Sequence, residues 1–182
     1  RLINAVEKNV RDYKGWADDL LDVLKLHDLP ASKENICATI DIIDQESSFV
    51  ADPAVAGLGK ISEAALRAKM DKVPVLGRVA LHFLEVRPSP ADNYLARIRA
   101  ARTERDLDLV YRAMVADAGK QTGLGLVINS GLIIKQIDGR NEIDTIGSMQ
   151  VSVDFALEVA KRRRWLPMSL DDVYALRDEL YT

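Results

Sequence analysis

Glu46 stands at the end of an apolar helical pattern, a position suited to acid–base chemistry. Ile36, Ile40 and Ile43 recur at three- and four-residue steps, and the same face continues to Glu46 and Ser47. Burial on that face and the negative end of a helix would both disfavour a charged carboxylate. An acid that keeps its proton near neutral pH can protonate a glycosidic oxygen. Spacing alone favours the alternative, a glutamate that reaches solvent at a helix end.

A second carboxylate is the usual partner of such an acid in a glycosidase. The candidates by position are Asp44, Asp52, Asp144 and Asp154. Asp44 lies two residues before Glu46, so a helix turns it to the opposite side. The others fall in expected loops or a first helical turn, where Asp usually caps a helix. None stands out, and one acid is enough if the substrate itself assists the reaction.

Two short segments resemble the active-site motifs of soluble-type lytic transglycosylases, members of the lysozyme superfamily. Gln45-Glu46-Ser47-Ser48-Phe49 is similar to the motif around their catalytic glutamate. Gly147-Ser148-Met149-Gln150-Val151 is similar to their Gly-Leu-Met-Gln motif, which Ile or Val follows, with Ser148 in place of leucine. The wider segment 36–155 also resembles an uncharacterised family of proteobacterial lipoproteins thought to share the lysozyme-like domain.

The resemblance implies a peptidoglycan lytic transglycosylase that cleaves the β-1,4 bond between N-acetylmuramic acid and N-acetylglucosamine. Glu46 would act as the single acid and base, and the product would carry a 1,6-anhydro ring. Ser47 would hydrogen-bond the N-acetyl group of the substrate. The remaining implied substrate-binding residues are Ser48, Gly147, Ser148, Met149, Gln150 and Val151. The resemblance implies no metal and no cofactor.

The resemblance also implies partners and a location. Peptidoglycan glycan strands would be the substrate, in the periplasm, with an upstream lipid anchor holding the full-length protein to the outer membrane. Nothing after Gln150 resembles the Asn-Ala-Gly loop that closes the family's site, and Tyr174 and Tyr181 are candidates for its tyrosine. We therefore expect a C-terminal fragment or a second chain to complete the cleft.

Composition excludes other functions. The 182 residues have a net charge of −3, which gives no global basic field for nucleic acid. No apolar run reaches the roughly 18 residues of a membrane span. Cys37 cannot form an internal disulfide and is expected to be a small buried side chain. His82 lies in an apolar stretch far from other potential metal ligands, so a structural role is expected.

Helical periodicity dominates and predicts a mainly α fold. The resemblance implies that this fold is lysozyme-like, in a single domain over residues 1–182. A helical insertion at about residues 60–120 would separate the two motifs, and the C-terminal part of the domain would be missing. Residues 124–137 fit either a small β-hairpin or a buried helix pair. Other helix boundaries are expected from caps and glycines, namely Ser32, Ser62, Ser89-Pro90, Thr103, Gly119, Ser152 and Ser169.

Two other classes of protein compete with the transglycosylase. One is a non-catalytic peptidoglycan-binding module that keeps the lysozyme-like cleft. The other is a helical interaction protein whose two motifs match by chance.

Overall fold

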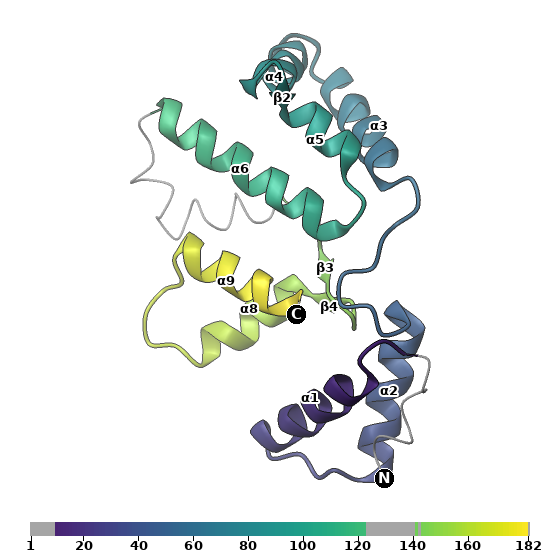
Figure 1. The fold of residues 1–182 in the computed structure, drawn as a ribbon. Helices are drawn as coiled ribbons and strands as arrows, with labels where there is room; N and C mark the ends of the chain where they lie inside the picture. Colours follow the sequence, from purple (N-terminus) through teal and green to yellow (C-terminus); the bar gives the residue numbers. More distant parts are fainter. Residues whose placement is uncertain (1–9, 123–140, 142, 182) are drawn as a thin grey trace.

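The computed structural model describes residues 10–122, 141 and 143–181, and this part of the chain is mainly helical with two small antiparallel strand pairs (Figure 1). The helices are α1 (Tyr13–Leu26), α2 (Lys33–Ser47), α3 (Leu58–Asp71), α4 (Pro74–Val86), α5 (Tyr94–Ala100), α6 (Glu104–Thr122), α8 (Val153–Arg162) and α9 (Leu170–Leu180). The strands are β1 (Pro88–Ser89), β2 (Asp92–Asn93), β3 (Thr145–Ile146) and β4 (Val151–Ser152). The mainly α prediction is confirmed, whereas the segment 124–137 lies outside the described residues.

The helices α1 and α2 form a pair whose core includes Ala17, Ile43 and Phe49. The ring of Trp16 meets that of Phe49 edge to face, with centroids 5.6 Å apart. Such pairs add to the stabilisation from burial. Phe49 follows α2, so this contact fixes the direction in which the chain leaves that helix.

The Ser32 hydroxyl accepts a hydrogen bond from the Asn35 amide at 3.2 Å, so the predicted cap of α2 is confirmed. Cys37, on the same helix, is exposed, and its predicted burial is wrong. α1 packs against only one side of α2. The buried face of α2 is therefore narrower than the apolar pattern of its sequence suggests, and Cys37 lies outside that face.

The helices α3, α4, α5 and α6 lie between the two motifs in sequence. They share a second core, formed by Leu84, Tyr94, Leu95, Ile98 and Val110. Thr103 and Asp106 cap α6 reciprocally, as predicted.

Three predicted boundaries in this segment are wrong. α3 begins at Leu58, so Ser62 is inside it. Ser89 belongs to a strand, and Asn93 caps the helix that follows. α6 continues through Gly119 to Thr122, because a single glycine weakens a helix without ending it.

The C-terminal helices α8 and α9 pack with β3 around a third core that includes Ile146, Val153, Leu157, Val173 and Tyr181. The hydroxyls of Ser152 and Ser169 cap α8 and α9, as predicted, and Ser169 forms a reciprocal capping box with Asp172. β3 and β4 pair in antiparallel register, with Thr145 opposite Ser152 and Ile146 opposite Val151.

Buried charges join α6 to α9. The carboxylate of Asp108, fully buried on α6, accepts hydrogen bonds from Asn141 at 2.6 Å and from Arg177 on α9 at 3.3 Å. Its other oxygen lies 2.5 Å from Arg112, which also pairs with Asp178 at 2.9 Å. Buried charges persist only when paired, so this network ties the second core to the third. No helix within the described residues has the length and apolarity to cross a membrane.

Candidate functional site

Glu46 is exposed to solvent in the last turn of α2, where the sequence predicted a half-buried acid. The buried residues of this helix are Ile43 and Ser47. The apolar face therefore passes through Ser47 and leaves Glu46 beside it. Helical spacing allowed either Glu46 or Ser47 to be buried. The narrow contact between α1 and α2 buries Ser47 and leaves Glu46 exposed.

The other residues of the first motif direct the chain away from α2. The hydroxyl of Ser47 donates to the carbonyl of Ile43 at 3.1 Å, and that of Ser48 donates to the carbonyl of Asp44 at 3.3 Å. Ser48 and Phe49 both have left-handed backbone conformations, with φ of 49° and 61°. Such conformations are uncommon outside glycine and give a sharp turn. The loop after α2 then reaches the start of α6, where Ala54 forms an antiparallel bridge with Thr103.

The second motif forms the tight turn between β3 and β4. The amide of Gln150 donates to the carbonyl of Gly147 at 3.1 Å and closes the turn. Gly147 has φ of 81°, and a Cβ added there would lie 1.9 Å from the carbonyl oxygen of Leu180. Only glycine fits so close to the end of α9. Met149 is exposed, whereas Ser148 and Val151 are half-buried.

The side-chain amide of Gln150 is held on both sides. Its oxygen accepts a hydrogen bond from the Thr145 hydroxyl at 2.7 Å. Its nitrogen donates to the carbonyl of Gly147 at 3.2 Å and to the carboxylate of Glu104 at 3.4 Å. Gln150 itself has φ of 47°, a left-handed conformation that costs a non-glycine residue about 1–2 kcal/mol. These three hydrogen bonds therefore hold the side-chain amide of Gln150 in one orientation at the edge of the turn.

Glu104, in the first turn of α6, is half-buried, as the sequence predicted for Glu46, although it lies at the opposite end of its helix. Burial raises the pKa of its carboxyl group, the hydrogen bond from Gln150 opposes that effect, and the negative charge of Asp52 raises the pKa further. Asp52 belongs to the loop after the first motif, so Glu104 lies between that loop and the turn of the second motif. The structure thus brings Gln150, Glu104 and Asp52 together, but gives no direct contact of Glu46 with Gln150.

Sequence reasoning missed Glu104. It directly follows Thr103, which reads as a helix cap, and a glutamate in a first helical turn is ordinary. Asp52 was weighed as a second acid without any feature to distinguish it. The signal that singles out both residues is tertiary: an isolated antiparallel bridge joins Ala54 to Thr103 and sets the two segments side by side.

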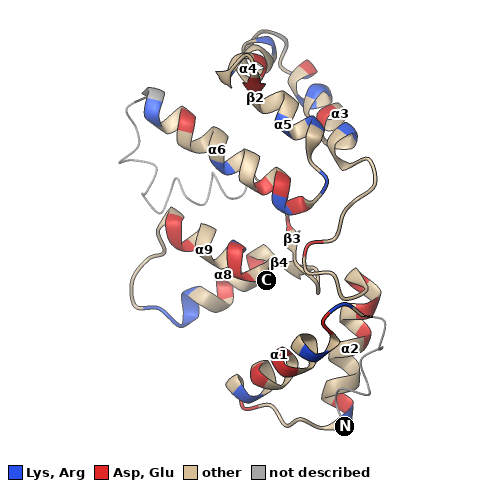
Figure 2. Ribbon diagram, viewed as in Figure 1, with Lys and Arg blue, Asp and Glu red and all other residues tan. Residues whose placement is uncertain are grey.

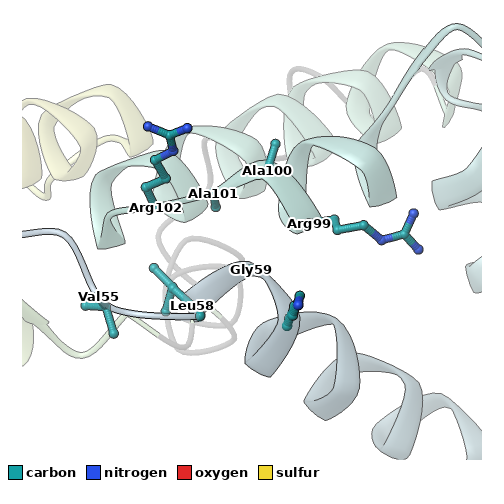
Figure 3. A pocket seen from close by; sticks show the side chains of 9 residues that line it. Val55, Leu58, Gly59, Arg99, Ala100, Ala101 and Arg102 are labelled. Carbon is teal, nitrogen blue, oxygen red and sulfur yellow. The ribbon is translucent and has the colours of Figure 1, made fainter.

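A cavity of about 420 Å³ lies between the segment 55–60 and the segment 99–102 (Figure 3). Its lining residues are Val55, Gly57, Leu58, Gly59, Lys60, Arg99, Ala100, Ala101 and Arg102. The amide of Val55 donates to the carbonyl of Arg102 at 2.9 Å across it. In Figure 3 the side chains of Arg99 and Arg102 point away from Leu58, and Arg99 pairs with Glu63 at 2.6 Å. The lining therefore combines backbone and small or apolar side chains with the cationic residues Lys60, Arg99 and Arg102.

Within the described residues no group of three or more His, Cys, Asp or Glu side chains is placed to hold a metal ion. His82 is exposed on α4. Figure 2 shows acidic and basic residues interspersed along the helices, with no element that is basic throughout.

The chain belongs to the DUF1615 family, described as a protein of unknown function, whose model matches residues 9–182. It is similar to the uncharacterized protein YaiW of Escherichia coli strain K12, with 27% identity over 157 residues. That match covers 86% of this chain and 40% of the relative, so the chain spans well under half of the relative's length. No solved structure gives a significant match.

Proposed function

We propose that the protein is a peptidoglycan lytic transglycosylase in which Glu46 is the acid and base. The supporting observation is the neighbourhood of the two motifs. The loop that leaves the first motif reaches Glu104 through Asp52, and Glu104 accepts a hydrogen bond from Gln150 of the second motif. The 420 Å³ cavity between the segments 55–60 and 99–102 offers room for one sugar ring or its substituents.

In the proposed reaction, Glu46 donates a proton to the oxygen that leaves the anomeric carbon of N-acetylmuramic acid. The bonding electron pair goes to that oxygen, and the acetamido oxygen of the same sugar stabilises the positive charge that develops. Glu46, now a carboxylate, takes the proton from the sugar's 6-hydroxyl as that oxygen bonds to the anomeric carbon. The ring closes without consuming water.

A glycan lying over the second motif would desolvate Glu46. The acid is exposed in the unoccupied protein, and catalytic geometry often tightens only when substrate binds. The exposed Ser48 would face the acetamido group with its hydroxyl oxygen, whose hydrogen is directed at the carbonyl of Asp44. Ser47 is buried and bonded to the carbonyl of Ile43, so it would support the end of α2 and not touch the glycan. Periplasmic location, an upstream lipid anchor and a further fragment or chain that completes the cleft belong to the same proposal.

Digestion of purified sacculi tests the proposal, with muropeptides separated and identified by mass spectrometry. The wild-type protein should release anhydro-muropeptides, and Glu46→Gln should release none while still binding sacculi. Glu34→Gln is the matched control, because Glu34 is an exposed glutamate near the other end of the same helix. If wild type and Glu46→Gln both bind but release nothing, the protein is a wall-binding module.

A further inference from the structure

Among the described residues the side-chain amide of Gln150 makes three hydrogen bonds, and one of these reaches a distant part of the chain. Thr145 and Gly147 belong to the same strand pair and turn, whereas Glu104 lies 46 positions away in sequence, at the start of α6. That one bond links the orientation of the amide to the helix that also carries the buried Asp108.

We propose that Glu104 is a positioning residue that fixes which way the Gln150 amide faces, so that its oxygen is presented to a hydrogen-bond donor on the glycan. The identity of the ligand as a glycan rests on the proposed function. The hydrogen bond between Glu104 and Gln150 does not depend on it.

The chemistry of the three partners sets the direction. A carboxylate and a backbone carbonyl only accept hydrogen bonds, so Glu104 and Gly147 both require the nitrogen of the amide on their side. The Thr145 hydroxyl can donate or accept, so it adapts to either orientation. An amide oxygen accepts two hydrogen bonds, and Thr145 uses one. The second place remains for a donor such as the N–H of an acetamido group or a sugar hydroxyl.

The neighbours of Glu104 support a role beyond packing. Asp52 approaches from the loop after the first motif, and Tyr181 approaches from the end of α9. Tyr181 is 2% exposed, its hydroxyl has no hydrogen-bond partner among the described residues, and burial raises its pKa. The guanidinium of Arg105 lies 5.7 Å from the centre of the Tyr181 ring. Glu104 therefore lies among titratable groups from the loop after α2, from α6 itself and from the end of α9.

Nuclear magnetic resonance of the Gln150 side-chain amide tests the contact directly. The two amide protons, assigned by their loss in Gln150→Ala, should shift as Glu104 ionises, and this titration should vanish in Glu104→Gln. Asp52→Asn is the control for the neighbouring carboxylate and should retain the titration. Burial raises the pKa of Tyr181, so this phenol does not contribute in the acidic range. An amide that does not titrate in the wild type, or still titrates in Glu104→Gln, overturns the proposal.

Binding to sacculi tests the consequence. Glu104→Ala removes the acceptor and should weaken binding about fivefold, the effect of one hydrogen bond. Glu104→Gln keeps an acceptor oxygen and should restore binding to within about twofold. Glu158→Gln, an exposed glutamate on α8, is the control. Equal binding by Glu104→Ala and this control overturns the proposal. If wild type binds no sacculi, the proposed function fails, and the amide titration still decides the role of Glu104.

Discussion

Arg177 on α9 donates a hydrogen bond to Asp108 on α6 at 3.3 Å, and both side chains are buried. Arg177 also donates to the carbonyl of Ile143, just before β3. One guanidinium therefore joins the helix that carries Glu104 to the segment that leads into the second motif. The geometry of the candidate site depends on this buried contact.

Replacing Arg177 with methionine should lower the free energy of unfolding by about 3–5 kcal/mol, because it leaves the Asp108 carboxylate buried with less compensation. Urea denaturation followed by circular dichroism measures the change. Arg162→Met, at an exposed position on α8, is the control and should change stability by about 0.5 kcal/mol or less. Equal effects of the two substitutions would contradict the structural role of Arg177.

Gly147→Ala should destabilise the protein more than Gly57→Ala, although both glycines have left-handed conformations. At Gly57 a Cβ meets open space, so the cost is conformational, about 1–2 kcal/mol. At Gly147 the Cβ would also collide with the carbonyl oxygen of Leu180, and the turn must move away from α9. Urea denaturation of both variants measures the difference. If the Gly147→Ala variant is no less stable than Gly57→Ala, the close approach of Gly147 to the carbonyl oxygen of Leu180 is contradicted.

Glu104 should make folding stability fall as the pH rises from the ordinary carboxyl range. Burial raises its pKa, so between the unfolded and folded values the folded state holds more protons than the unfolded state. Stability is lost through that window. Glu104→Gln removes the titration, so the stability of this variant relative to wild type should be higher at about pH 7 than at about pH 3.5. Urea denaturation at both pH values measures this, and a relative stability that falls with pH would contradict it.

Local features of the fold were predictable from the sequence. The caps at Ser32, Thr103, Ser152 and Ser169 form as expected, because each depends on a hydrogen bond to a residue three positions away. The mainly helical class followed from periodicity for the same reason.

The exposure of individual residues was not predictable in the same way. Cys37 and Glu46 lie on or beside an apolar helix face, but their exposure depends on how much of that face α1 covers. Glu104 gains its buried environment from contacts with Asp52 and Gln150, both distant in sequence. A short sequence motif identified Gln150 of the candidate site, whereas only tertiary packing identifies Glu104 and Asp52.

The mass of the product formed in ¹⁸O-labelled water tests the central claim most directly. A transglycosylase closes the muramic ring with the sugar's own oxygen. Muropeptides released from sacculi should therefore be one water lighter than hydrolysed ones, free of ¹⁸O, and absent with Glu46→Gln. Muropeptides with an ¹⁸O-labelled reducing end, or anhydro products that persist with Glu46→Gln, would contradict the account.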